Sequence, residues 1–272
     1  MFGYIPRNSP IHRLTGAAKL ILTLALSVAT MITFDTRFLA FAIIMSLTLF
    51  KVSKLRLSEL KAPLIFISVF LVINNIVIFL FAPEQGVLIY GTRHDLFHIY
   101  GRYTLIAEQL FYQLNVTLKY FAIVPIALIF FLTTEPSEFA SSLNAVRVNY
   151  KAAYAVSLSL RYIPDVQRSY REISQAQQAR GVDISKKAPL HRRLAGVLTI
   201  LFPLVFSSMD KIEQISNAME LRGFGRLGKR TWYSSRRFSS GDFMVLGLSA
   251  LVILLSILTF FLNGGRFYNP FD

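Results

Sequence analysis

Residues 63–81 read PLIFISVFLVINNIVIFLF, a run without a single charged side chain. A helix needs about 20 apolar residues to cross the hydrocarbon core of a bilayer, so this stretch predicts a transmembrane helix. The composition agrees, since 54% of the 272 residues are hydrophobic and the mean hydropathy is +0.50. Ordinary soluble domains are less apolar and do not gather their apolar residues in long runs. The sequence therefore predicts an all-α, polytopic membrane protein.

Four further apolar runs lie on either side of this stretch. Residues 20–34 and 38–50 precede it, Leu105–Leu132 follows it, and Phe243–Leu262 is the last. The two early runs are short for a full crossing, which predicts a tilted hairpin or a shallow pair. Counted as about five transmembrane helices, these runs place every basic cluster on the same side of the membrane as the N-terminus, and the C-terminus on the other side.

The net charge of +14 is unevenly distributed. Residues 134–241 hold 17 Lys and Arg against 8 Asp and Glu, so +9 of the +14 lies in one segment. Basic residues are retained on the cytoplasmic side of membrane proteins, and no nucleic-acid motif accompanies this charge. We therefore expect an N-terminal membrane domain (1–133), a cytoplasmic domain of long amphipathic helices (134–241), and a C-terminal transmembrane helix with its tail (242–272).

The pattern I-S-x-A-x-x-x-R-G occurs twice in the basic segment. It begins at Ile173 and again at Ile215, 42 residues later. Each copy closes a long helix-compatible stretch, with arginine in the last turn and glycine where a left-handed residue ends a helix. On a helix the isoleucine, alanine and arginine share one face, and the small alanine allows close approach of another surface. The duplication indicates two equivalent docking points for two similar partners.

A purely structural explanation competes with this one. Arginine near a helix C-terminus and glycine beyond it are ordinary capping, with a charge–dipole interaction of about 0.3–1 kcal/mol. Capping does not, however, require the same Ile-Ser pair seven residues before each arginine. We therefore interpret the two ends, Arg180-Gly181 and Arg222-Gly223, as contact sites.

Leu194–Met209 is a nearly uncharged stretch that competes for the role of a membrane span. If it crossed, the two Arg-Gly ends would face opposite sides of the membrane. Its length is marginal, and Pro203 is expected to interrupt it. We expect it to lie against the membrane or other helices, as the apolar half of a long helix. Ala152–Ile163, followed by Pro164, is expected to do the same before the first copy.

The sequence offers little for catalysis or cofactor binding. Residues 223–230, GFGRLGKR, resemble a phosphate-binding loop, but such a loop follows a strand and opens a helix, whereas here a helix precedes it. Cysteine is absent, and no catalytic triad, paired-carboxylate cleft or metal cluster stands out. We expect no catalytic residues, no metal site and no cofactor.

Several stretches resemble the transmembrane T component of energy-coupling factor transporters, the ATP-driven vitamin and metal importers of prokaryotes. The resemblance covers most of the chain and has its clearest blocks at Tyr4–Leu14, Thr133–Leu143, Ser159–Pro164 and Ala176–Gly181. Two departures stand out. The family often has Leu-Asp-Pro-Arg where this chain has Leu14–Ala17, and alanine is more typical than Leu221 before the second Arg-Gly.

The resemblance implies a scaffold in the prokaryotic cell membrane that joins two cytoplasmic ABC ATPase subunits to an exchangeable substrate-binding membrane subunit. The N-terminus and residues 134–241 would be cytoplasmic, and ATP and Mg²⁺ would be bound by the ATPases. Arg180 and Arg222 would dock in grooves of the two ATPases. The expected coupling residues are Ala179, Arg180, Gly181, Leu221, Arg222 and Gly223, supported by the helix-face residues Ile173, Ala176, Ile215 and Ala218.

Two rival functions remain open on the sequence. A conventional ABC permease subunit would form its own substrate path, but it predicts one coupling helix per chain instead of two. A membrane enzyme acting on phosphorylated lipids or isoprenoids would need an acidic metal-binding cluster, which the sparse acidic residues of 134–241 do not supply.

Overall fold

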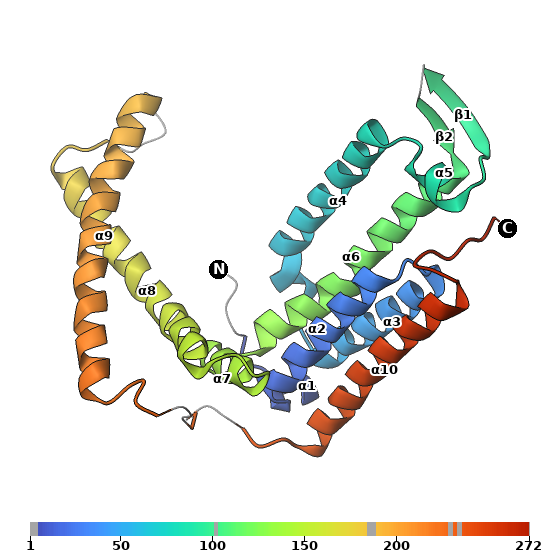
Figure 1. Cartoon of the computed structure of the whole chain (residues 1–272). Coiled ribbons are helices and arrows are strands. Elements are labelled where there is room, and N and C mark those ends of the chain that lie inside the picture. Colours follow the sequence, from blue (N-terminus) through green and yellow to red (C-terminus); the bar gives the residue numbers. More distant parts are fainter. Residues whose placement is uncertain (1–4, 101–102, 184–188, 228–230, 233–235, 272) are drawn as a thin grey trace. The chain divides into compact units, whose positions relative to one another are not determined.

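The computed structural model describes residues 5–100, 103–183, 189–227, 231–232 and 236–271, and Tyr4 lies outside these ranges. The chain divides into two compact units. The first combines Met1–Glu135 with Arg236–Asp272, and the second is Pro136–Ser235. Both units are built from helices (Figure 1). The all-α, polytopic fold class is therefore confirmed, with one small exception described below.

The first unit is a bundle of long helices. Four of them, α2, α3, α6 and α10, pack together around a core that includes Leu26, Leu39 and Val252, all completely buried (Figure 1). Its helical elements are α1 (Pro10–Arg13), α2 (Gly16–Ile32), α3 (Thr36–Ser53), η1 (Leu57–Leu60), α4 (Lys61–Phe81), α5 (Gln85–Tyr90), α6 (Ala107–Thr133) and α10 (Ser240–Leu262).

Helices α2 and α10 lie parallel although they are far apart in the sequence. The Asp242 carboxylate accepts hydrogen bonds from the backbone N–H and the hydroxyl of Thr15, at 2.7 and 2.9 Å. Fourteen residues further along both helices, the Ser256 hydroxyl donates to the Ala29 carbonyl at 3.2 Å. Thr15 also caps α2. The departure from the usual Leu-Asp-Pro-Arg thus leaves a threonine that caps α2 and joins it to α10.

The short helix α1 is held by His12. Its Nδ1 lies 2.7 Å from the Ser9 hydroxyl and its Nε2 lies 3.0 Å from the Ile5 carbonyl oxygen. Since a carbonyl only accepts, Nε2 carries a proton and Nδ1 accepts from Ser9 when the ring is neutral. Burial lowers the pKa of His12, with the positive charges of Lys19 and Arg7 acting in the same direction. The lowered pKa favours the neutral ring.

Five helices are long and apolar enough to cross a membrane. They are α3, α4, α6, α10 and His191–Leu221 of α9, whereas α2 is a shorter apolar helix of 17 residues. The expected spans 38–50, 63–81, 105–132 and 243–262 each coincide with one of them. Because length and composition admit α9 as well, the expectation that Leu194–Met209 lies along the membrane stays a prediction.

Polar residues inside the spans contact neighbouring elements, as expected from the cost of exposing them to lipid. On α4, the Asn75 amide donates to the Thr117 hydroxyl of α6 at 3.1 Å. Lys119 of α6 places its Nζ 3.0 Å from the centroid of the Phe34 ring. These contacts tie α4 and the α2–α3 connection to α6.

A β-hairpin lies between α5 and α6. Strands β1 (Asp95–Tyr100) and β2 (Tyr103–Ile106) pair antiparallel and lead directly into α6. Their aromatic and β-branched residues favour strands, but the runs are too short and too mixed to predict one from the sequence.

The second unit holds α7 (Pro136–Ala145), α8 (Tyr150–Ala179) and α9 (Leu190–Leu221). Both long helices contain a proline, Pro164 in α8 and Pro203 in α9, and both continue through it. The expectation that proline interrupts Leu194–Met209 is therefore wrong. One proline removes a single backbone hydrogen bond, and the bonds on either side are enough to keep the helix continuous.

Candidate functional site

The two long helices of the second unit pack as an antiparallel pair. The hollow between them is lined by residues 158–167 of α8 and 208–219 of α9, and the Lys211 ammonium donates to the Ser169 hydroxyl at 3.0 Å. Further toward the start of α8, Tyr150 and Tyr154 contact Phe224, which follows α9. Residues early in one helix thus meet residues late in the other.

The first Arg-Gly end closes α8 with two nested hydrogen bonds. The Val182 N–H donates to the Gln177 carbonyl at 3.1 Å, and the Gly181 N–H donates to the Gln178 carbonyl at 2.9 Å. This is the Schellman arrangement, which needs a left-handed residue just beyond the cap. Gly181 supplies it with φ +87°, and Arg180 is the cap residue.

The second Arg-Gly end closes α9 in the same way. The Phe224 N–H donates to the Met219 carbonyl at 2.9 Å, and the Gly223 N–H donates to the Glu220 carbonyl at 2.8 Å. Gly223 has φ +67°, and Arg222 is the cap residue. The expectation of a left-handed glycine at both helix ends is confirmed. Both arginines are exposed.

The two ends point in opposite directions along the pair. Each is the C-terminal end of its helix, and the helices are antiparallel. With 30 and 32 residues, α8 and α9 are about 45 and 48 Å long at a rise of 1.5 Å per residue. The two arginines therefore lie on helix ends that point in opposite directions.

The predicted supporting face is divided between two environments. Ile173 and Ile215 are half-buried, and Ile215 lines the hollow between the helices. Ala176 and Ala218 are exposed, and so is Ala179. Ile215 thus helps to hold the helix pair together, while the alanines leave open surface next to each arginine.

Leu221 is 90% exposed, the highest value among the large hydrophobic side chains of the described residues. It lies immediately before Arg222, at the position that Ala179 has in the first copy. An apolar side chain this exposed beside a charged contact residue is typical of a surface that is covered by a partner.

An aromatic cluster that the sequence reasoning missed holds the second end. Phe224 packs against Tyr154 with ring centroids 4.8 Å apart and against Tyr150 at 5.8 Å. The Trp232 indole N–H donates to the Asn144 side chain at 3.0 Å, and its ring lies 6.3 Å from that of Tyr154. Phe224, the aromatic residue directly after the second Arg-Gly, was the feature of the sequence that could have indicated this cluster.

Neither phosphate nor metal chemistry has a matching geometry within the described ranges. Gly223 and Gly225 follow a helix and lie in a turn, and Gly228, Lys229 and Arg230 lie outside the described residues. Over the described part of the chain, no group of three or more His, Asp or Glu side chains is placed to hold a metal ion.

Comparison with known proteins identifies a family whose sequence pattern includes both helix ends. The family model CbiQ, described as cobalt transport protein, matches residues 7–233, most of the chain including both Arg-Gly ends. The chain belongs to the CbiQ family.

Several relatives carry the name energy-coupling factor transporter transmembrane protein EcfT. The one from Exiguobacterium sibiricum is 28% identical over 270 residues, covering 96% of this chain and 98% of the relative. The one from Bacillus subtilis is 25% identical over 271 residues, which cover 96% of this chain and 96% of the relative. The one from Lactococcus lactis subsp. cremoris is 28% identical over 264 residues, which cover 93% of this chain and 94% of the relative. This CbiQ-family chain is an EcfT-type, multi-pass transmembrane component of an energy-coupling factor transporter, which works in a complex with other components.

Proposed function

We propose that this chain is a non-catalytic coupling scaffold that joins two cytoplasmic ABC ATPases to an exchangeable substrate-binding membrane subunit during vitamin or metal-ion uptake. One observation carries the proposal: α8 and α9 end in the same cap, each with an exposed arginine, and the two ends of this antiparallel pair point in opposite directions. Two similar ends pointing apart fit two similar partners better than one.

The chemistry of the contact follows from the guanidinium group. Arginine presents a planar fork of five donors that pairs with a carboxylate through two parallel hydrogen bonds. Arg180 and Arg222 would each enter a groove of one ATPase and pair with acidic groups there. ATP and Mg²⁺ would be held by the ATPases, and this chain would contribute no catalytic residue.

Transmission would run along the helices. ATP binding draws the two ATPases together and displaces the two Arg-Gly ends. Because α8 and α9 continue through Pro164 and Pro203, each helix carries that displacement as one rigid element. The first half of α9 presents a broad apolar face that suits the substrate-binding subunit, formed by Leu194, Val197, Leu198, Leu201, Phe202, Val205 and Phe206.

The orientation follows from charge. With the prokaryotic cell membrane as the location, the basic segment 134–241 and the N-terminus would lie in the cytoplasm, where the ATPases are. The identity of the cargo would be set by the substrate-binding subunit.

The test is the double variant Arg180→Ala with Arg222→Ala. We expect it to reach the membrane normally, to lose co-purification of both ATPases and to abolish uptake. The charge-matched control Arg171→Ala with Arg192→Ala removes one exposed arginine from each of the same helices and should leave assembly intact. Normal assembly and uptake in the Arg180→Ala, Arg222→Ala variant would contradict the proposal. Two copies of this chain for every two ATPases in the purified complex would favour a conventional permease instead.

A further inference from the structure

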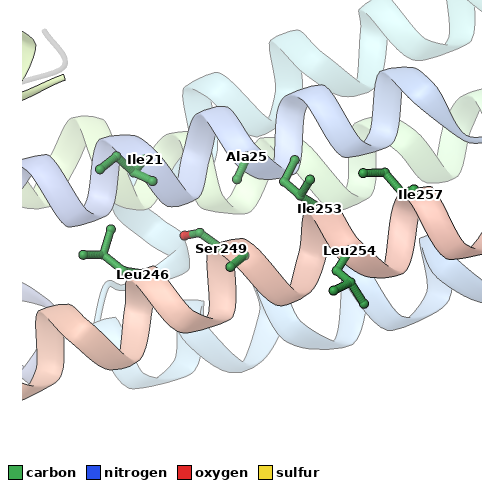
Figure 2. A pocket seen from close by; sticks show the side chains of 8 residues that line it. Ile21, Ala25, Leu246, Ser249, Ile253, Leu254 and Ile257 are labelled. Atoms are coloured by element: carbon green, nitrogen blue, oxygen red, sulfur yellow. The ribbon is translucent and has the colours of Figure 1, made fainter. Parts of the chain in front are cut away.

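An apolar hollow of about 640 Å³ lies between α2 and α10 in the first unit. Figure 2 shows Ile21 and Ala25 of α2 beside Leu246, Ser249 and Ile253 of α10. The one hydroxyl in the wall, that of Ser249, donates to the Val245 carbonyl of its own helix at 2.8 Å. The Ser249 proton is therefore already used, and the rest of the lining is apolar, so the hollow suits a hydrocarbon occupant.

The hollow exists because small residues meet at one level of the helix pair. The bonds from Thr15 to Asp242 and from Ser256 to Ala29 both join residues 227 positions apart, which fixes a constant register. In this register Ala25 lies level with the turn of α10 between Ser249 and Ile253. Larger side chains, Ile21 and Leu246 among them, close the hollow at one end (Figure 2).

The length of the hollow matches one lipid leaflet. Its lining on α10 runs from Leu246 to Ile257, which at 1.5 Å per residue is about 16 Å. Half of the hydrocarbon core of a bilayer is about 15 Å thick. Leu246 lies six residues, about 9 Å, after Ser240, so an acyl chain that enters beside the first turns of α2 and α10 would reach the hollow there and follow it toward the middle of the bilayer.

Arginines gather at the end of the pair where both helices begin. Arg13 lies two residues before Thr15, and the Arg236 guanidinium donates to the His12 carbonyl at 3.4 Å. Arg237 is adjacent and exposed. The acid at this end, Asp242, is completely buried and its two oxygens accept from Thr15 and Ser239. The Asp242 carboxylate is thus buried and hydrogen-bonded, while Arg13, Arg236 and Arg237 are exposed.

We infer that this face is a binding site for one anionic phospholipid, with its phosphate among Arg13, Arg236 and Arg237 and one acyl chain in the hollow between α2 and α10. Basic side chains at the membrane surface attract anionic lipids, and a preformed hollow adds van der Waals contacts that a smooth helix surface lacks. Such a lipid would cover the seam that joins the last helix of the chain to the first long one.

The headgroup contact is tested by native mass spectrometry of the full-length protein. With phosphatidylglycerol and phosphatidylcholine of identical chains, we expect one phosphatidylglycerol to be retained preferentially. Arg13→Gln and Arg237→Gln should each weaken that retention about fivefold, since a basic residue near the surface contributes about 1 kcal/mol. Arg56→Gln, an exposed arginine beyond the end of α3, should leave it unchanged. Equal retention of both lipids would overturn the inference.

The hollow is tested by filling it. Ala25→Leu with Ala250→Leu should abolish the preferential retention, whereas Ala40→Leu on an exposed face of α3 should not. If the double variant does not fold, competition on the unmodified protein decides the matter, because dihexanoyl phosphatidylglycerol has chains too short to fill the hollow and must compete poorly. A photoreactive residue at position 250 should capture lipid. Capture of a membrane subunit at that position, or equal competition by the short-chain lipid, would refute the site.

Discussion

The two Arg-Gly ends have the same cap and different surroundings. At both, the residue after glycine donates to a carbonyl five residues back, and glycine itself is left-handed. After the second end, however, Phe224 packs against Tyr150 and Tyr154, whereas its counterpart after the first end is Val182, which carries no ring for such contacts. A repeated sequence therefore reproduces the local geometry, and contacts from elsewhere in the chain decide how firmly each arginine is positioned.

Removing one arginine at a time measures how much each helix end contributes to ATPase association. Truncating one partner of a desolvated charge pair costs about 2–5 kcal/mol, so we expect Arg180→Ala and Arg222→Ala each to weaken ATPase association by at least an order of magnitude. The loss should be the greater for Arg222→Ala, because a pre-positioned arginine contributes more than one that must be ordered on binding. Titration of purified ATPases against each variant provides the measurement. An equal loss would show that the aromatic contact does not matter to docking.

The variant Phe224→Ala distinguishes the contribution of the aromatic contact from that of the helix cap. Phe224→Ala removes two ring contacts worth about 0.5–1.5 kcal/mol each, beyond the apolar area that it exposes. We expect the variant to lower ATPase association through the Arg222 end and to reduce the stability of the second unit. The matched variant Val182→Ala, at the same position after the first cap, should have little effect on either. Hydrogen exchange of residues 216–224 would report the change directly, and unaltered exchange there would contradict the prediction.

The features that the sequence predicted are those set by short-range patterns. Apolar runs located α3, α4, α6 and α10, and the Arg-Gly pairs located the ends of α8 and α9, because hydrophobic period and capping act over a few residues. The contact of Phe224 with Tyr154 joins residues 70 positions apart, and that of Thr15 with Asp242 joins residues 227 apart. No local pattern predicts such pairings. The prediction that Pro203 interrupts Leu194–Met209 was wrong for a related reason. Proline acts locally, whereas the hydrogen bonds along the rest of α9 keep the helix continuous.

The same substitution at both glycines compares the backbone strain that the two caps impose. Gly181→Ala and Gly223→Ala would each place a side chain in the left-handed region, which costs about 1–2 kcal/mol. An added Cβ meets nothing at position 181 and only ordinary contact with Arg226 at position 223, so the backbone conformation alone sets the penalty. We expect similar losses of thermal stability from the two variants. A much larger loss at one position would mean that the two caps are less alike than their hydrogen bonds indicate.

The smallest effect is expected from the position directly before each arginine, where the two copies of the motif carry different exposed side chains. Leu221 and Ala179 precede the two arginines, and both are exposed, so exchanging them should change the stability of the protein by less than about 0.5 kcal/mol. If Leu221 is covered by one ATPase and Ala179 by the other, Leu221→Ala with Ala179→Leu should alter which ATPase binds at which end. Cross-linking from cysteines introduced next to each arginine would record the assignment. Because the exchange leaves both caps and both charges in place, an altered assignment would locate partner choice in this side chain, and an unaltered one would leave it to Phe224 and the surface around it.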